Sequence, residues 1–363
     1  MQSLKYDLIV VGAGLSGLVA AATAAEAGGR VAVVHGGLGT FVYGAGCIAD
    51  LPAEGGEEQR RAVAFFEAMT EAAGSPYYGQ PGDRHMLPTI LGTFQPVSLV
   101  PFCLWGGRVQ AGARVSVAGI AGLSSFDARF TAERLNQQAE ELGLQSRYVP
   151  RIIDLPHEGS VPHSTLNIAN RFDRDEPFRR LFAERLRAVQ GECDQILLPA
   201  CLGQQTSRID IEDFQAQLGR PLGELPTLPP SMAGLRLNNR LLGHLRRRGV
   251  EMIGGYPLLS LDLADGICRG VVVDNPGRAR TLAAKSVVLA CGPQSETLLP
   301  GWSRRVDARQ RPLNDQNQLL AEGIHVAGAL LFPTGRRGGN GRAIVSGHAA
   351  ALMAAGREKS HAA

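Results

Sequence analysis

Three glycines near the start of the chain, Gly12, Gly14 and Gly17, have the spacing of a phosphate-binding turn. In such a turn the first glycine permits a tight bend, the second lets the backbone approach a pyrophosphate, and the third lets a helix pack on a strand. The first N–H groups of that helix face the anion. The spacing predicts a dinucleotide-binding site formed by Gly12, Gly14, Leu15, Ser16 and Gly17.

The residues around this turn supply the strands and the helix that it needs. Tyr6–Val11 is an apolar, β-branched run typical of a buried parallel strand, and Leu18–Ala27 is an alanine-rich helix that stops at two glycines. Arg30–His35 is a second strand, which completes a β-α-β unit. We therefore interpret the uncharged run Leu8–Ala25 as part of this unit, and not as a signal peptide or a membrane-spanning helix.

The end of the second strand departs from the usual dinucleotide-binding pattern. An acid normally stands there and binds the ribose 2′-hydroxyl. This chain has His35 followed by Gly36, and the first acid after them is Asp50. Histidine can also hydrogen-bond a hydroxyl, so His35 and Gly36 are candidate cofactor contacts, although His35 could equally be an exposed residue at a strand end.

Two later segments repeat the pattern of an apolar strand followed by small residues. Lys285–Gly292 ends in Cys291 and Gly292, and Gly323–Gly328 is a similar strand. A glycine loop at 338–341 and a helix at 342–355 follow. Together with the N-terminal turn, these segments resemble the glutathione-reductase-type flavoprotein fold.

That resemblance implies an α/β, Rossmann-like FAD/NAD(P)-binding fold with an inserted α+β cap domain. In that fold a late helix aims its N–H groups at the flavin, which becomes anionic on reduction. The superfamily usually has an acid after the late glycine, whereas Ala329 follows Gly328 here. A small-residue loop at 44–46 would also let the backbone approach a ring. The further cofactor contacts implied are Gly44, Ala45, Gly46, Cys291, Gly292, Gly328, Gly341, Arg342 and Ala343.

Changes in composition along the chain predict the domain boundaries. Residues 1–75 and 231–363 have strand–glycine–helix character and would form a discontinuous flavin-binding domain. Residues 76–230 lack that strand–glycine–helix character and would form the inserted cap or substrate domain. The pattern of 128–142 indicates an amphipathic helix, whereas 74–101, which crosses the first boundary, looks irregular.

Segments in the middle of the chain narrow the resemblance further. Residues 117–127, 167–169 and 196–203, and above all the proline-rich Leu225–Ser231, are similar to the B-type subunit of the anaerobic glycerol-3-phosphate dehydrogenases. The likeness covers most of the chain, although not every residue of 50–110. The prolines make Leu225–Ser231 a rigid extended segment, either a linker or a wall of the flavin or substrate cleft.

The family implies a function carried out with partner subunits. Sn-glycerol 3-phosphate would be oxidised to dihydroxyacetone phosphate, and electrons would pass to quinone. The implied partners are a related FAD-containing catalytic subunit and an iron–sulfur subunit that docks to the membrane. The chain would be cytoplasmic, held peripherally at the inner face of the cell membrane through these partners. The family implies FMN, whereas the glycine turn predicts FAD, so the identity of the flavin stays open.

Two other functions fit the same residues. The chain could be a non-catalytic structural subunit with a degenerate flavin site, as the departures at His35 and Ala329 favour. It could also be a free-standing FAD-dependent oxidoreductase with another substrate. The candidate catalytic residues are Arg336, Arg337 and His348, for which a surface position or a packing role is the alternative.

Composition excludes several other classes of protein. The net charge is +3 and aromatic residues make up 6% of the chain, which argues against a nucleic-acid partner and leaves a small-molecule substrate. No pair of the six cysteines is spaced Cys-x-x-Cys and no His/Cys cluster occurs, so we expect no metal or iron–sulfur site in this chain and a reducing compartment.

Overall fold

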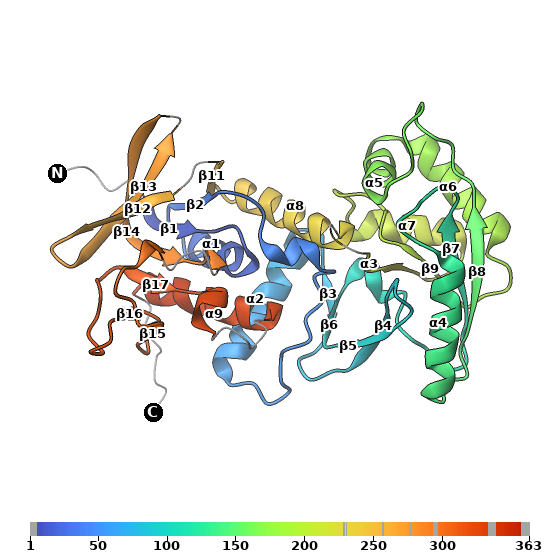
Figure 1. Cartoon of the computed structure of the whole chain (residues 1–363), viewed down its shortest axis with the longest axis horizontal. Helices are drawn as coiled ribbons and strands as arrows, with labels where there is room; N and C mark the ends of the chain where they lie inside the picture. Colours follow the sequence, from blue (N-terminus) through green and yellow to red (C-terminus); the bar gives the residue numbers. More distant parts are fainter. Residues whose placement is uncertain are drawn as a thin grey trace. The chain divides into compact units, whose positions relative to one another are not determined.

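The computed structural model describes residues 6–227, 229, 231–255, 258–275, 277–292, 297–332 and 339–356 (Figure 1). The chain forms two compact units. Unit 1 contains residues 1–40, 55–69 and 241–363, and unit 2 contains residues 41–54 and 70–240. The domain boundaries at 75/76 and 230/231 stay a prediction.

Unit 1 is built on a sheet whose central strands are all parallel. Their order is β11-β2-β1-β14, and β17 pairs with the other side of β14. β1, β2, β17 and the last four residues of β14 are apolar or small and largely buried, as strands covered on both faces require, whereas the edge strand β11 and the first half of β14 are more exposed. Their bounds are β1 Tyr6–Val11, β2 Val31–His35, β11 Glu251–Gly254, β14 Arg278–Leu289 and β17 Ile324–Val326.

Strand β14 pairs with different strands along its two halves. Its second half pairs with β1, and its first half pairs antiparallel with β13 (Ile267–Asn275), which in turn pairs with β12 (Leu258–Ala264). A short pair, β15 (Arg305–Val306) and β16 (Pro312–Leu313), lies before β17 in the chain.

Helices α1 (Leu15–Glu26) and α9 (Asn340–Ala354) pack against each other in unit 1. Both are rich in alanine and small residues, which permits close helix–helix contact. The helix predicted at 342–355 begins earlier, at Asn340, whereas Gly338 of the predicted glycine loop lies outside the described residues. The short helix η3 (Gly328–Leu331) follows β17.

Unit 2 contains a parallel sheet of four strands in the order β10-β9-β7-β8. Helices connect its strands, and the chain winds to both sides of β7. The strands are β7 Arg114–Ile120, β8 Arg147–Ile153, β9 Gln195–Pro199 and β10 Leu222–Leu225. The helices are α3 Phe102–Trp105, α4 Ala128–Glu141, α5 Thr165–Arg174, α6 Glu176–Val189 and α7 Arg208–Leu218.

The stretch 74–101 contains more regular structure than its composition indicates. It forms two antiparallel pairs, β3 with β6 and β4 with β5, because cross-strand partners supply hydrogen bonds that no local pattern reveals. The bounds are β3 Tyr77–Gly79, β4 His85–Pro88, β5 Phe94–Val97 and β6 Leu99–Pro101. The remaining elements are η1 Thr40–Tyr43, α2 Glu57–Ala72 and α8 Met232–Arg247.

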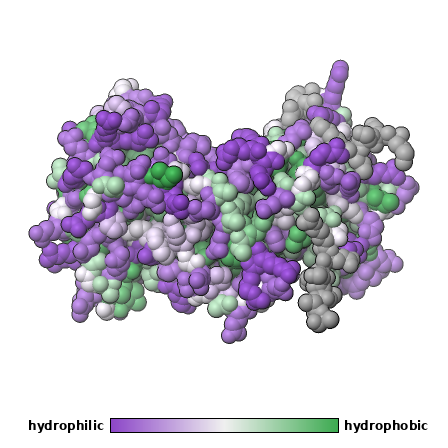
Figure 2. Space-filling model, turned by 180° about the vertical axis from the view of Figure 1, so that it is seen from behind, coloured by the Kyte–Doolittle hydropathy of each residue, from purple (hydrophilic) through white to green (hydrophobic). Residues whose placement is uncertain are grey.

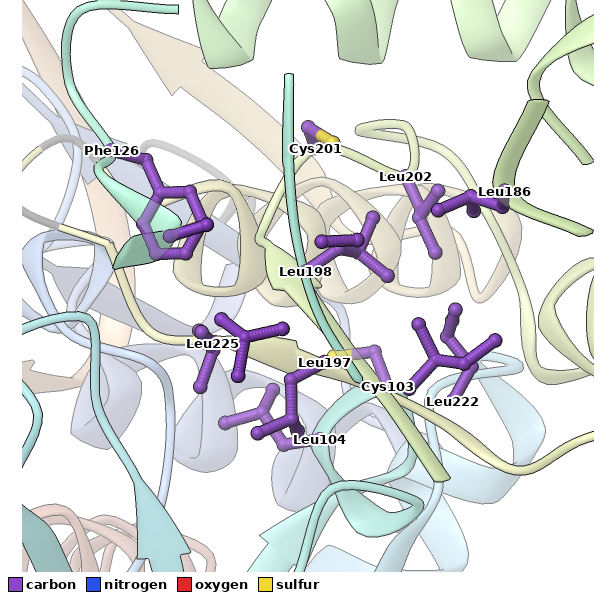
Figure 3. Packing of buried hydrophobic residues seen from close by; sticks show 14 of the residues in the cluster. Cys103, Leu104, Phe126, Leu186, Leu197, Leu198, Cys201, Leu202, Leu222 and Leu225 are labelled. Carbon is purple, nitrogen blue, oxygen red and sulfur yellow. The ribbon is translucent and has the colours of Figure 1, made fainter. Parts of the chain in front are cut away.

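The core of unit 2 lies on the two faces of its sheet. Figure 3 shows Leu197 and Leu198 of β9 among Leu104, Leu222 and Leu225, with their side chains directed to opposite sides of the strand. On the helical side, the rings of Phe172, Phe182 and Phe214 make edge-to-face contacts with centroids 5.2 to 6.4 Å apart.

Candidate functional site

The carboxyl ends of the parallel strands in unit 1 meet at one edge of the sheet. The backbone N–H of Gly12 donates to the carbonyl of Val34 over 2.8 Å, and that of Ala290 donates to the carbonyl of Val11 over 2.8 Å. On the other side of β14, the N–H of Ala327 donates to Leu289 over 2.9 Å. Loops from four strands therefore leave from this edge, which is where ligands of such sheets bind.

Gly12 and Gly17 are required by the packing of the chain itself. Gly12 has φ +111°, and a Cβ there would lie 2.5 Å from the carbonyl oxygen of Ala290. A Cβ at Gly17 would lie 2.0 Å from the carbonyl oxygen of Gly12. Both residues let α1 begin directly against β1 and β14, as the sequence pattern predicts.

Gly14 has no such internal reason to be glycine. Its φ is −71°, which any residue adopts, and the nearest atom to an added Cβ is the Ala290 carbonyl oxygen at 3.8 Å. Apart from its neighbours in the chain, no other atom of the described residues lies within 4 Å of this position, as the approach of a pyrophosphate to Gly14 requires.

The first turn of α1 is suited to an anion. It carries no acidic residue, and Gly14 at its N-cap supplies no side-chain cap. Ser16 is buried, and among the described residues its hydroxyl has no hydrogen-bond partner. A buried hydroxyl without a partner is costly, so a ligand that bonds it fits this position.

The late glycine and the closing helix meet the first turn of α1. A Cβ on Gly328, whose φ is +73°, would lie 3.1 Å from Cβ of Ser16, and a Cβ on Gly347 would lie 2.2 Å from the Ser16 carbonyl oxygen. The N–H of Gly328 donates to Oγ of Ser346 over 3.0 Å, and that hydroxyl donates to the carbonyl of Arg342 over 2.7 Å. Ser16, Gly328 and the start of α9 thus come together from the two ends of the chain.

Sequence reasoning missed Ser346 and Gly347. Their signal is a Ser-Gly pair inside an otherwise alanine-rich helix, which marks a close approach of two backbones. The first turn of α9 contains Gly341, Arg342 and Ala343 and no acid, so it can also face an anionic group. The guanidinium of Arg342 lies over the ring of Phe332 at 5.0 Å.

At the end of β2, the imidazole of His35 is held by its own loop. Its Nδ1 lies 3.1 Å from the carbonyl oxygen of Gly37, to which it donates in the tautomer protonated there. The ring packs on Gly254 of β11, where an added Cβ would lie 2.8 Å from Nε2. Gly36 is exposed, with open space beside it. Cys291 and Gly292 follow β14 directly, and Cα of Cys291 lies 2.9 Å from the position of an added Gly12 Cβ.

The predicted contacts at 44–46 belong to unit 2. The hydroxyl of Tyr77 donates to the carbonyl of Gly46 over 2.8 Å, and the carbonyl oxygen of Gly44 lies 2.4 Å from an added Cβ on Gly234 of α8. The loop is therefore pressed onto α8 through a second small residue. Burial raises the pKa of the neighbouring Cys47 thiol to about 12, so this thiol stays protonated at neutral pH.

The three candidate catalytic residues are placed differently. Arg336 and Arg337 lie outside the described residues. His348 is buried in α9, with its ring 5.2 Å from that of Phe65 in α2. Burial, and secondly the charge of Arg61, lower the pKa of His348, so its imidazole is neutral at neutral pH.

Segments similar to the dehydrogenase family gather at the carboxyl edge of the unit 2 sheet. Residues 121–127 follow β7 and residues 200–203 follow β9. The proline-rich Leu225–Ser231 begins at the end of β10, although Leu228 and Pro230 within it lie outside the described residues. Within the described part of that edge, the hydroxyls of Thr227 and Ser231 are buried without a hydrogen-bond partner.

The described residues also show two absences. Among them no helix is long and apolar enough to cross a membrane. They likewise contain no group of three or more His, Cys, Asp or Glu side chains that could hold a metal ion. On the face shown in Figure 2, hydrophilic residues predominate and hydrophobic ones form small groups.

The parallel sheet and its glycine turn define a Rossmann-like, dinucleotide-binding fold. The FAD binding domain family matches residues 7–73 and 54–255, which is more than half of the chain, and the chain therefore belongs to that family. This assignment makes the cofactor FAD and the protein a member of a family of FAD-dependent oxidoreductases.

Named relatives confirm the narrower resemblance. The B-type subunit of the anaerobic glycerol-3-phosphate dehydrogenase of Yersinia enterocolitica is 28% identical over 326 residues, covering 80% of this chain and 75% of that protein. The subunit of the same name from Pectobacterium carotovorum is 29% identical over 323 residues, with the same coverage of 80% and 75%. Among solved structures, 3-ketosteroid delta1-dehydrogenase from Sterolibacterium denitrificans is similar at 17% identity and a TM-score of 0.36, covering 83% of this chain and 48% of that one.

Proposed function

We propose that this chain is the flavin-binding subunit of a quinone-linked anaerobic glycerol-3-phosphate dehydrogenase. With partner subunits it oxidises sn-glycerol 3-phosphate to dihydroxyacetone phosphate. The observation that carries the proposal is the buried hydroxyl of Ser16, which has no partner among the described residues and lies at the uncapped start of α1 against Gly328. The names of the relatives support the substrate.

Different residues at the sheet edge are proposed to contact different parts of the cofactor. The turn from Gly12 to Gly17 holds the pyrophosphate through backbone N–H groups and the Ser16 hydroxyl. His35 and Gly36 contact the ribose, for which the imidazole has to exchange its bond to Gly37. The first turn of α9, Gly341–Ala343, stabilises negative charge on the flavin ring through its N–H groups. The other proposed contacts of unit 1 are Cys291, Gly292 and Gly328, and the contacts at Gly44, Ala45 and Gly46 of unit 2 stay a sequence-based prediction.

Oxidation at C2 of the substrate requires a hydride acceptor and groups that bind the phosphate. The bound flavin would supply the acceptor. Arg336 and Arg337 are the proposed phosphate ligands, since a guanidinium fork matches phosphate oxygens. His348, which burial keeps neutral, is the proposed acceptor of the hydroxyl proton.

The proposed assembly contains two partners. One is a related FAD-containing catalytic subunit, and the other is an iron–sulfur subunit that carries electrons to quinone and holds the complex at the inner face of the membrane. Each relative is named as a subunit of an enzyme, which supports a multi-subunit assembly.

A non-catalytic subunit with a weakened flavin site is the second candidate. The bond between the His35 ring and its own loop favours it, because that bond occupies the side chain expected to hold the ribose. The substitution of Ala329 for an acid acts in the same direction.

Cofactor binding is tested on the purified full chain, alone and co-expressed with its partners. We expect heat to release FAD. Ser16→Ala should weaken FAD binding about 10- to 100-fold, because a hydrogen bond to a charged group contributes about 1.5–3 kcal/mol. Ser260→Ala, at an exposed position of β12, is the matched control and should bind as the wild type does. Absence of flavin from both preparations would reject the flavin-binding function.

The substrate is tested separately by anaerobic addition of sn-glycerol 3-phosphate to the FAD-loaded protein. Bleaching of the flavin absorbance is expected with the partners present. Bleaching of the chain alone would show that it needs no catalytic partner. A preparation that holds FAD but bleaches in neither case would reject this substrate and leave FAD binding intact.

A further inference from the structure

Unit 2 contains a cavity of about 290 Å³ at the amino-terminal edge of its sheet. One wall is a face of α7 made by Arg208, Ile211, Glu212 and Gln215, which recur at helical spacing. The opposite wall comes from α3 and the residues after it, including Trp105 and Arg108. All of these residues lie within one compact unit.

Arg108 is fixed in this wall by Trp105. Its guanidinium carbon lies 3.1 Å from the centroid of the indole, and its Nη1 donates to the Trp105 carbonyl over 2.8 Å. The indole is held in turn by Tyr78 and His85, whose ring centroids are each 5.1 Å from its own. A guanidinium stacked in this way keeps its plane, so the N–H groups at its edge are preorganised for an acceptor.

The two arginines of the cavity differ in their charge balance. Arg208 forms ion pairs with Glu71 at 3.0 Å and with Glu212 at 3.5 Å. Among the described residues, the Arg108 guanidinium has no carboxylate partner and makes one hydrogen bond, to the Trp105 carbonyl. Partial burial lowers the pKa of Arg108, because burial disfavours the charged form of the guanidinium.

We propose that this cavity binds the oxyanion group of a small metabolite, a carboxylate or a phosphate, through Arg108. A half-buried cation without a counter-charge is costly, and an anion in the cavity removes that cost. Arginine forms paired N–H···O bonds with carboxylate and phosphate alike. The volume lies at the lower end of the range for small-molecule sites, and Phe102 and Ile211 supply apolar surface for a short carbon chain.

The two tryptophans of the chain provide a direct readout. In the full-length, FAD-loaded Trp302→Phe variant, Trp105 is the sole tryptophan. Titration with sodium phosphate and with sodium propanoate should change its emission saturably, since the ligand binds the guanidinium stacked on the ring. Sodium chloride at the same ionic strength is the control. A response to phosphate alone, to propanoate alone or to both supports the site and identifies the head group it accepts.

Variants in the same background test the role of Arg108. Arg108→Gln should abolish the saturable response, and Arg108→Lys should weaken it at least tenfold because lysine lacks the fork. Arg185→Gln, at an exposed position of α6, should leave it unchanged. Glu212→Gln should tighten binding severalfold, because it removes from the cavity wall a negative charge that repels the anion. This variant tests the site even if Arg108→Gln fails to fold. A response no greater than that to chloride, or one equal in Arg108→Gln, overturns the proposal.

Discussion

Gly14 and Gly17 are glycines for different physical reasons, although they belong to one turn. A side chain at Gly17 would collide with the Gly12 carbonyl oxygen, so Gly17 is needed for α1 to pack on β1. A Cβ at Gly14 would meet only ordinary contact with the Ala290 carbonyl oxygen. The first is a requirement of folding, and the second is the requirement proposed for a ligand.

We therefore expect alanine to lower the stability of the fold at Gly17 and the affinity for FAD at Gly14. Gly17→Ala should destabilise the chain by about 1–3 kcal/mol, the usual cost of overpacking, as measured by urea unfolding. Gly14→Ala should unfold at the wild-type urea concentration yet bind FAD at least tenfold more weakly in a titration. Wild-type FAD affinity in Gly14→Ala would show that no ligand occupies the space beside this residue.

At the scale of elements, a buried ion pair positions the loop after β9. Glu224 of β10 accepts the N–H groups of Cys201 and Leu202 over 2.8 and 2.7 Å, and receives Nη1 of Arg236 over 2.6 Å. Arg236 of α8 also donates to the carbonyls of Leu202 and Gly203. The side chains of Glu224 and Arg236 are 0% and 1% exposed. Strand, helix and loop thus share one polar network.

Breaking this network from one side should be costly. Glu224→Gln or Arg236→Met leaves a buried charge without its partner, for which about 3–5 kcal/mol of unfolding free energy is expected. The double variant should lose less than the sum of the two, because neither charge is then left alone. Glu176→Gln, which breaks the exposed pair with Arg180, is the control and should leave stability unchanged. Additive losses would contradict the coupling.

At the scale of the whole molecule, two buried histidines link stability to pH. Burial is the main cause that lowers the pKa of both His325 and His348 below the ordinary value of 6.5. In the unfolded chain both histidines take up a proton near pH 6.5, whereas in the folded chain they take it up only at lower pH. Their contribution to stability is therefore full above 6.5 and falls as the pH falls below it.

We expect the urea midpoint to fall between about pH 7.5 and about pH 5.5. His348→Leu fills the same space against Phe65 without a titrating group, so it should reduce this fall. Ser260→Ala, at an exposed position of β12, changes no titrating group and is the control; it should keep the wild-type pH dependence. An unchanged slope in His348→Leu would show that this histidine is not excluded from protonation in the folded state.

The sequence by itself determined the features that depend on neighbouring residues. The β-α-β unit, its glycine turn and the helix now seen as α4 follow from periodicity and turn chemistry, which act over a few residues.

Only the tertiary structure decided which distant residues meet. It placed Ser16 against Gly328 and Gly347, the loop at 44–46 against α8, and the stacked Arg108 opposite α7. Neither the order of the unit 2 strands nor the network of Glu224 and Arg236 has a local signal. These contacts arise because burying apolar surface brings remote segments together, and the buried polar groups must then find partners among whatever lies beside them.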